Sequence, residues 1–368
     1  MEPLDSYLYS EFGTRVRVLR NKKREGLIRS RLHGAREAKG EVLIFLDSHI
    51  EATPGWLEPL LQEVHNDKRT VVTPLIDILD KDTFAYRYNK GPKVSVGGFD
   101  WRLVFTWHTA PDEDLAKRSL DHQPVRSPTM AGGLFAISKE YFSDIGTYDA
   151  GMEIWGGENL EISFRIWMCG GNLVTVPCSR VGHVFRDRSP YKWKPGVNVL
   201  QKNNIRLAEV WLDEYKEIYY KNLNIRQNDV RQEHLKARKQ LRKDLHCKSF
   251  QWYLNNIYPT MWNPFDSLYK GQLAAGNGFY CLDAEVNRRQ INEGKPARVK
   301  SKKIISNQRN YQVWFYSKMN EIRIDGACLD YPGGKKHMDK PKKVITYPCH
   351  GSRGNQVWLY NVRIIILA

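Results

Sequence analysis

The chain has 368 residues, of which 41% are hydrophobic, 27% charged and 12% aromatic, a composition that excludes a disordered or collagen-like protein and suggests about two domains. No stretch approaches the roughly 18 to 20 consecutive apolar residues of a membrane span. Lys and Arg (57) outnumber Asp and Glu (41) by 16, a balance that suits nucleic acid, lipid headgroups or nucleotide diphosphates but does not choose among them.

Strand and helix patterns alternate through the first 75 residues. Apolar residues alternate or follow helical spacing in segments that predict, in order, a strand at 15–19, a helix at 24–39, a strand at 41–46, a helix at 56–64 and a strand at 71–75. This alternation predicts an α/β domain with a parallel sheet.

A basic helical region and a set of short repeats follow. Residues 200–258 carry apolar stripes at helical spacing, which we interpret as faces of helices that cover the core. Beyond residue 272, the tripeptide CLD at 281–283 recurs at 328–330, and QVW at 312–314 recurs at 356–358. Two matched tripeptides in matching order predict a repeated β unit of about 45 residues.

The six cysteines contain no CxxC pair, which argues against a zinc ribbon or a thioredoxin motif. Disulfides formed in a secretory compartment are the favoured interpretation. Buried, reduced cysteines in a cytosolic protein are the alternative.

Asp47, Ser48 and His49 follow the strand predicted at 41–46, at the sheet end where α/β proteins bind ligands. Asp47 and His49 would share a face of an extended segment, and an oxygen with a nitrogen ligand suits manganese, iron or zinc. His183, which follows another strand-like run, is the candidate third ligand, and Arg186 is suited to phosphate. A hydrogen-bonded turn and a core histidine are the alternatives.

Two glycine-rich segments are candidates for ligand contact. Residues 155–159 combine a tryptophan, two glycines, a carboxylate and an amide, a set that fits a sugar ring. Gly132 and Gly133 allow the same close approach. The alternatives are a tight turn before a helix and a bend in a strand. No catalytic Ser/His/Asp triad, dinucleotide fingerprint or phosphate loop is present, so phosphate binding would use arginines and a metal.

Six motifs in order, NKKREGLIRSR, FLDSH, GGFDWRL, MAGGLFAI, WGGENLEISFRIW and PCSRVGHVFR, resemble the polypeptide N-acetylgalactosaminyltransferase family over residues 5–260. Residues 273–368 resemble the ricin-type lectin domain that follows in that family. The resemblance implies an α/β domain of the Rossmann-like GT-A class over 1–262 that lacks its first strand, a linker at 263–272, and an incomplete all-β trefoil over 273–368.

The implied activity is retaining transfer of GalNAc from UDP-GalNAc to Ser or Thr hydroxyls of polypeptides or GalNAc-glycopeptides. The family implies the lumenal face of the Golgi membrane, reached through an N-terminal single-pass anchor expected upstream of this chain. A chain without its first strand is expected to be a poor transferase. The alternatives are a catalytically inactive, lectin-like member of the family and a nucleic-acid binder.

The resemblance also assigns roles to individual residues. The manganese(II) ligands would be Asp47, His49 and His183. The residues expected to bind the donor are Arg24, Ser48, Gly132, Gly133, Trp155, Arg186 and Tyr191, and those expected in the reaction site are Trp155, Glu158 and Arg186. The implied disulfides join Cys169 to Cys247 and Cys328 to Cys349, and the implied sugar ligands of the lectin part are Asp330 and Asn355.

Overall fold

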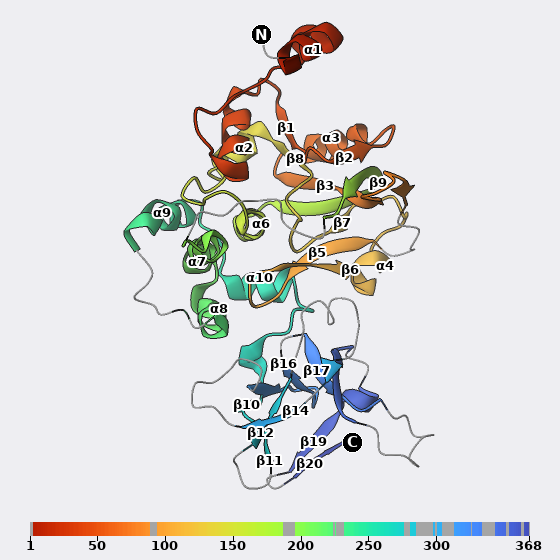
Figure 1. The fold of residues 1–368 in the computed structure, drawn as a ribbon, viewed down its shortest axis with the longest axis vertical. Helices are drawn as coiled ribbons and strands as arrows, with labels where there is room; N and C mark the ends of the chain where they lie inside the picture. Colours follow the sequence, from red (N-terminus) through yellow and green to blue (C-terminus); the bar gives the residue numbers. More distant parts are fainter. Residues whose placement is uncertain are drawn as a thin grey trace. The chain divides into compact units, whose positions relative to one another are not determined.

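Figure 1 shows a computed structural model of the protein, which describes residues 3–88, 94–186, 196–223, 225, 232–275, 280–284, 297–298, 300–303, 313–324, 326–332, 343–350, 353–361 and 364–367. The chain divides into two compact units. The first comprises Met1–Phe99, Trp107–Lys216 and Gln227–Tyr253, and the second comprises Asp100–Thr106, Glu217–Arg226 and Leu254–Ala368. The domain limits at 262 and 273 stay predictions.

The first unit is built on a mixed sheet (Figure 1). Its strands lie in the order β1 (Val42–Phe45), β8 (Phe135–Ser138), β3 (Thr70–Leu79), β9 (Asn172–Val184) and β2 (Ile50–Ala52), with β4 (Tyr86–Arg87) on β3 and β7 (Val125–Arg126) on β9. Only β3 and β9 run parallel among the described pairs of this sheet, so the prediction of a parallel sheet holds for its centre alone. A separate two-stranded sheet joins β5 (Ser95–Phe99) to β6 (Phe105–Thr109).

The α-helices are α1 (Pro3–Phe12), α2 (Gly26–Glu37), α3 (Leu57–Asn66), α4 (Asp112–Ala116), α5 (Lys139–Asp144), α6 (Glu158–Met168), α7 (Val199–Trp211), α8 (Lys216–Leu223), α9 (Lys236–Asp244) and α10 (Phe250–Asn256). The helices predicted at 24–39 and 56–64 are confirmed as α2 and α3, and the helical region at 200–258 as α7 to α10. Among the residues that the structure describes, no helix is long and apolar enough to cross a membrane.

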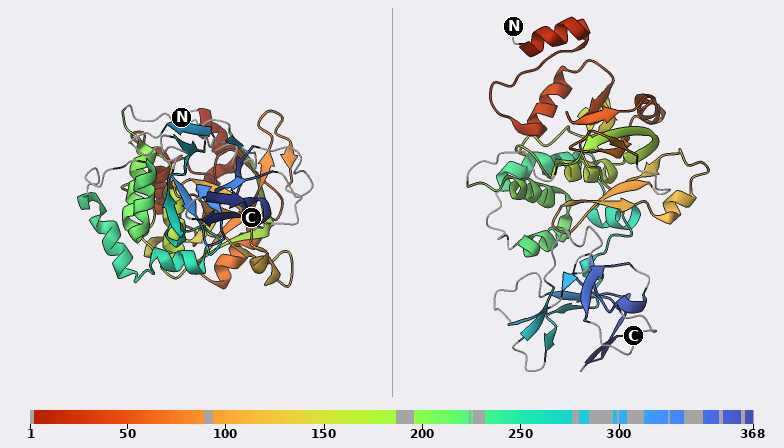
Figure 2. Two further views of the ribbon diagram at one scale, coloured as in Figure 1. Left: turned by 90° about the horizontal axis from the view of Figure 1, so that it is seen from below. Right: turned by 45° about the vertical axis from the view of Figure 1, so that its right-hand side comes forward.

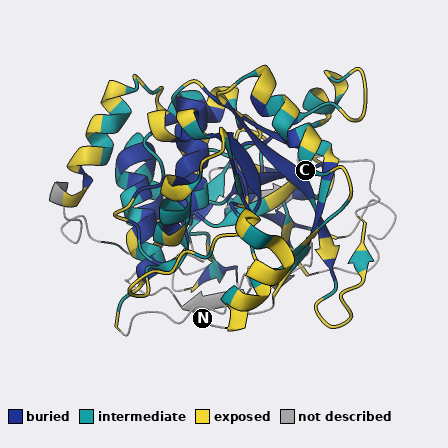
Figure 3. Ribbon diagram, turned by 90° about the horizontal axis from the view of Figure 1, so that it is seen from above, coloured by how far each residue is buried: buried dark blue, intermediate teal, exposed yellow. Residues whose placement is uncertain are grey.

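The strand predicted at residues 15–19 is wrong. Gly13–Arg15 form a 3₁₀ turn, and residues 16–20 belong to no strand. Val16 has an extended backbone, but its side chain and that of Leu19 are exposed, and no described strand pairs with this segment. An alternating pattern forms a strand only where a partner accepts its backbone hydrogen bonds. The preceding helix α1 is also exposed, with no buried residue (Figure 3).

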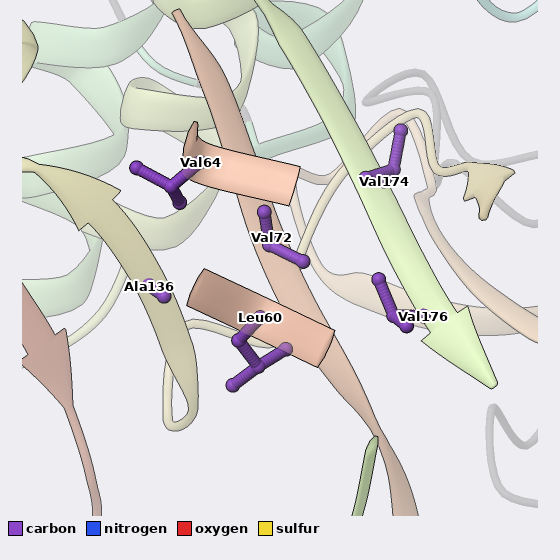
Figure 4. Packing of buried hydrophobic residues seen from close by; sticks show 6 residues of the cluster. All are labelled: Leu60, Val64, Val72, Ala136, Val174 and Val176. Carbon is purple, nitrogen blue, oxygen red and sulfur yellow. The ribbon is translucent and has the colours of Figure 1, made fainter. Parts of the chain in front are cut away.

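Helix α3 covers one face of the sheet because its apolar residues are four apart. Leu60 and Val64 therefore share one side of the helix and are both buried. They pack with residues of the three central strands, as Figure 4 shows: Val72 of β3, Ala136 of β8, and Val174 and Val176 of β9. This cluster fixes the register of the strands whose ends carry the candidate site.

Helix α6 is buried along nearly its whole length, and it contains a buried ion pair. Glu161 accepts two hydrogen bonds from Arg165 and one from Arg238 of α9, and a fourth donor is the indole of Trp211. The last turn of α6 is tied to the segment after α9 by a disulfide between Cys169 and Cys247. These contacts tie the first turn of α6 to α9 and the end of α6 to the segment that follows α9.

From Tyr269 onward the second unit is built mainly of short antiparallel strands (Figure 2). One sheet has the order β10 (Tyr269–Gly271), β15 (Trp314–Tyr316), β16 (Ile322–Ile324), β17 (Ala327–Asp330), β18 (Ile345–Pro348) and β13 (Ala297–Arg298). A second has β11 (Ala274–Ala275), β12 (Tyr280–Asp283) and β14 (Lys300–Lys303), and a third pairs β19 (Trp358–Asn361) with β20 (Ile364–Leu367).

The two sequence repeats of this unit make equivalent hydrogen bonds. The indole N–H of Trp314 donates to the carbonyl of Leu282 at 2.9 Å, and the indole N–H of Trp358 donates to the carbonyl of Leu329 at 2.9 Å. Each QVW tryptophan thus binds the leucine of the CLD segment of its own repeat. The repeats differ in their cysteines, because Cys328 bonds to Cys349 whereas Cys281 is buried and free.

Candidate active site

The end of β1 and the pairing of β2 with β9 bring the predicted metal ligands together. Asp47 and His49 follow β1, and β2 begins immediately after them at Ile50. Ile50 pairs with His183 of β9 in the antiparallel register, so His183 lies beside residues 136 positions earlier in the chain. Ligand atoms of Asp47, His49 and His183 all lie within 4.8 Å of one another. The structure therefore contains a possible Asp-His-His metal site.

The donor atoms of this cluster fit a divalent cation. Asp47 Oδ2 is 3.3 Å from His183 Nε2, and the rings of His49 and His183 are 4.5 Å apart. The Nδ1 atoms of both histidines are buried, and neither has a hydrogen-bond partner among the described residues. Buried polar atoms are normally satisfied, so an unpaired nitrogen on each of the two histidines fits a site that can bind a metal ion. One carboxylate and two imidazoles are a common set for transition-metal ions.

The protonation states of the cluster favour metal binding. Burial alone would raise the pKa of the Asp47 carboxyl, but the hydrogen bond with His183 and the charge of Arg31 outweigh it and lower that pKa below its usual value. Burial lowers the pKa of His49, and electrostatic interactions with His183 and Arg186 lower it further. A carboxylate and a neutral imidazole are the forms that coordinate a metal.

Arg31 of α2, which the sequence reasoning missed, binds both Asp47 and the glycine segment. Its Nη2 donates to Asp47 Oδ1 at 2.9 Å and to the Gly133 carbonyl at 3.2 Å, and its Nη1 donates to the Gly132 carbonyl. A signal in the sequence could have found it. Arg31 lies three residues after Ile28 and four before Ala35, the two buried residues of α2, so helical spacing places it on the buried face.

Gly132 and Gly133 are required by close packing around the cluster. Gly132 has φ +86°, and a Cβ there would lie 2.6 Å from Cβ of Asn159. A Cβ on Gly133 would lie 2.5 Å from Oδ2 of Asp47. Both distances are shorter than real Cβ contacts allow, so these glycines let the chain approach the metal cluster on one side and α6 on the other.

The sugar-binding candidates lie at the start of α6. Glu158 is its first residue, and its buried carboxylate accepts a hydrogen bond from the backbone N–H of Gly156 at 2.6 Å. Burial raises the pKa of Glu158, while backbone N–H groups and the charge of Arg31 oppose the increase. Trp155 is 36% exposed in the turn before the helix, so its ring is accessible to a ligand.

The remaining predicted donor residues are exposed or lie outside the described residues. Arg24 and Ser48 are exposed. Arg186 is exposed at the end of a described segment, where its charge acts on His49. Tyr191 lies outside the described residues.

An apolar cavity of about 340 Å³ adjoins the metal cluster. Its lining includes Leu134, Phe185, Trp107 and Met130. Phe185 packs on the ring of His183 with 4.7 Å between ring centres, and Leu134 follows Gly133 directly, so both residues connect the cavity to the cluster.

The second unit holds a separate polar site. Asp330 is buried and accepts hydrogen bonds from Asn355 Nδ2 at 2.7 Å and from Gln356 Nε2 at 2.9 Å. His350 Nε2 lies 3.3 Å from Asn355 Oδ1, and Tyr347 is exposed nearby in sequence. The carboxylate and amide predicted to bind sugar are therefore in contact, with Gln356 as an added partner.

Three descriptions of known protein families match the chain. Glycosyl transferase family 2 matches residues 2–142, the N-terminal domain of galactosyltransferase matches residues 113–187, and the ricin-type beta-trefoil lectin domain matches residues 269–366. The first two cover β1, β8 and β9 and hence all three members of the metal cluster.

Curated proteins and a solved structure are similar over most of the chain. Polypeptide N-acetylgalactosaminyltransferase 5 of Caenorhabditis elegans is 54% identical over 90% of this chain and 52% of its own length. Polypeptide N-acetylgalactosaminyltransferase 13 of Homo sapiens is 46% identical over 86% of this chain and 55% of its own length. The crystal structure of GalNAc-T7 with UDP, GalNAc and Mn2+ superposes with a TM-score of 0.68 at 33% identity, over 98% of this chain and 66% of that one. The chain thus spans about half the length of these curated relatives.

Proposed function

Because the chain belongs to the family of polypeptide N-acetylgalactosaminyltransferases over the part of its relatives that it spans, we propose that it is a retaining glycosyltransferase. It transfers GalNAc from UDP-GalNAc to Ser or Thr hydroxyls of polypeptides. The observation that carries this proposal is the cluster of Asp47, His49 and His183, in which the Nδ1 atoms of both histidines are buried and unpaired among the described residues.

Asp47, His49 and His183 would hold Mn²⁺, the ion present in the solved GalNAc-T7 structure. When bound, Mn²⁺ supplies a Lewis acid that neutralises the charge developing on the departing diphosphate. The chain itself contributes a deprotonated Asp47 and a neutral His49, both prepared by their surroundings.

The donor would be bound by residues on both sides of the metal cluster. Arg186 supplies a positive charge beside His49, where a diphosphate oxygen can accept its hydrogen bonds. Trp155 offers an accessible ring for a sugar face, and Glu158 fixes the turn that carries it through the N–H of Gly156. The other donor residues in this proposal are Arg24, Ser48, Gly132, Gly133 and Tyr191.

The acceptor would enter from the apolar cavity. Phe185 and Leu134 line it and also contact or adjoin the metal cluster, so a peptide side chain in the cavity would lie next to the reacting groups. A cavity of about 340 Å³ suits one or two apolar side chains rather than a second sugar nucleotide. Asp330 and Asn355 would bind a GalNAc residue already attached to the acceptor.

The two disulfides support an oxidising compartment, in agreement with the proposed Golgi lumen. In this proposal the protein acts at the lumenal face of the Golgi membrane.

The test is GalNAc transfer from UDP-GalNAc to a Thr-rich peptide, with Mn²⁺ and with EDTA. Asp47→Ala and His183→Ala should abolish transfer. His65→Ala, which removes an exposed histidine from the last turn of α3, should not change the rate. Metal-independent transfer, or wild-type rates in the Asp47 variant, would falsify the assignment.

A second candidate function is carbohydrate binding without catalysis. The hydrogen bonds of Asp330 with Asn355 and Gln356 favour carbohydrate binding by the second unit, independent of any catalysis in the first. Saturable GalNAc binding with no turnover of UDP-GalNAc would select this function over the first.

A further inference from the structure

Resting on the proposed metal site, we propose that Arg31 is a positioning residue that limits Asp47 to one available oxygen and thereby sets which divalent cations the site accepts. The proposal concerns the selectivity of the site for metals, and its test does not depend on transfer activity.

The guanidinium of Arg31 is held by three acceptors on two segments of chain. One is Asp47 Oδ1, and the other two are the successive carbonyls of Gly132 and Gly133. The side chains of Arg31 and Asp47 are only 11% and 20% exposed, so water screens their ion pair weakly. A planar guanidinium can serve three acceptors in fixed directions, whereas a lysine ammonium cannot reproduce this fork.

The ion pair between Arg31 and Asp47 makes the two oxygens of the Asp47 carboxylate unequal. Oδ1 is occupied by Arg31 at 2.9 Å, whereas Oδ2 lies 3.3 Å from Nε2 of His183, another residue of the cluster. Gly133 leaves room beside Oδ2, because a Cβ at this position would lie 2.5 Å from that oxygen. While the contact with Arg31 persists, Oδ1 is engaged and Oδ2 is the oxygen left for a cation.

This restriction favours some cations over others. Calcium takes about six to eight oxygen ligands and commonly binds carboxylates through both oxygens. Manganese, iron and zinc accept a mixed set of imidazole and carboxylate ligands. A site with two histidines and a single carboxylate oxygen therefore discriminates against Ca²⁺, and releasing Asp47 from Arg31 should weaken that discrimination.

The experiment measures metal binding by the 368-residue chain. Mn²⁺ affinity is determined from the EPR signal of free Mn²⁺, and Ca²⁺ affinity from its competition with Mn²⁺. The variants are Arg31→Lys, which keeps the charge and loses the fork, and Arg31→Gln, which keeps one amide donor. The matched control is Arg29→Lys, two residues away on α2, where the side chain is 36% exposed and pairs with Glu25.

We expect Arg31→Lys to weaken Mn²⁺ binding by about 10-fold or more, as for other residues that orient a metal ligand. Ca²⁺ binding should be unchanged or tighter, so the ratio of Mn²⁺ affinity to Ca²⁺ affinity should fall by about 10-fold or more. The control should keep the wild-type ratio. In a protein that already carries Asp47→Asn, adding Arg31→Lys should not change the ratio of Mn²⁺ to Ca²⁺ affinity any further. The reason is that Arg31 affects the metal only by positioning Asp47.

Melting temperatures of the variants distinguish a change in the positioning of Asp47 from a general loss of structure. If Arg31→Lys unfolds, the measurement is made with Arg31→Gln. An unchanged ratio in a folded Arg31 variant, or an equal loss for both ions, overturns the proposal. No Mn²⁺ binding by the wild-type chain overturns it as well. Mn²⁺ binding with the expected shift in ratio supports it whether or not the chain transfers GalNAc, so this outcome is distinguishable from a failure of the proposed transferase function.

Discussion

Replacing Gly133 by alanine would insert a methyl group against the metal cluster. Its Cβ would lie 2.5 Å from Asp47 Oδ2 and 3.2 Å from Cγ of the same residue. Ordinary van der Waals contact begins at 3.4 Å, so the carboxylate oxygen would have to retreat by about 0.9 Å, the difference between 3.4 and 2.5 Å. Gly132 has a positive φ and Gly133 does not, so the cost at Gly133 is steric.

Asp47 cannot retreat without losing contacts. Its Oδ1 is held by Arg31 at 2.9 Å, and its Oδ2 lies 3.3 Å from His183. Overpacking of this kind costs about 1–3 kcal/mol of folding free energy. A shift of about one ångström in a ligand should also lower Mn²⁺ affinity by about 10- to 100-fold, the usual effect of disturbing a ligand's support.

Mn²⁺ titration followed by EPR measures the affinity, and thermal unfolding measures the stability. The control is Gly34→Ala in α2, where a Cβ would meet nothing within 4 Å and alanine is the better helix former. It should bind Mn²⁺ like the wild type. Wild-type Mn²⁺ affinity in folded Gly133→Ala would refute the reasoning, since the oxygen next to the new methyl group would then not be a ligand.

Three further outcomes are expected. Burial alone would raise the pKa of Glu161, but the charges of its arginine partners outweigh burial and lower that pKa from 4.5 to about 2. The ionised Glu161 therefore stabilises the fold fully above pH 4.5, and this contribution to the free energy of unfolding is lost as the pH falls toward 2. Glu161→Gln should cost about 3–5 kcal/mol at pH 7 and flatten this acid dependence, as measured by urea unfolding at several pH values. Reduction of the bond between Cys169 and Cys247, which are 78 residues apart, should lower stability by about 4 kcal/mol, and non-reducing peptide mapping should first find them joined. Asp330→Ala should remove any saturable GalNAc shift seen by NMR in the second unit; a shift that persists would place sugar binding elsewhere.

Local patterns in the sequence were sufficient for several features. Helical spacing predicted α2 and α3, the short apolar run predicted β1, and matched tripeptides predicted the repeat in the second unit. The pair of Asp47 and His49 was predicted from an extended segment, and the structure does bring the two residues into one cluster, but residues 48–49 form a bend rather than an extended strand. Family resemblance implied both disulfides, and the structure contains both.

Local sequence patterns gave wrong predictions where the structure depends on which other strand of the chain a segment pairs with. Residues 15–19 alternate like a strand, yet no described strand pairs with them. The alternation of strands and helices predicted a parallel sheet, but β8 lies between β1 and β3 and runs antiparallel to both. Strand direction and pairing depend on where distant segments return to the sheet, which periodicity does not record.

The sequence by itself determined the types of ligand and the class of fold, because both depend on residue identity and short-range spacing. Only the tertiary structure decided how the site is assembled. His183 reaches Asp47 through the register of β2 with β9, Arg31 reaches the same carboxylate from α2, and Gly133 sets its clearance. These contacts join residues separated by up to 136 positions, and their geometry depends on the packing of α3 and α6 on the sheet.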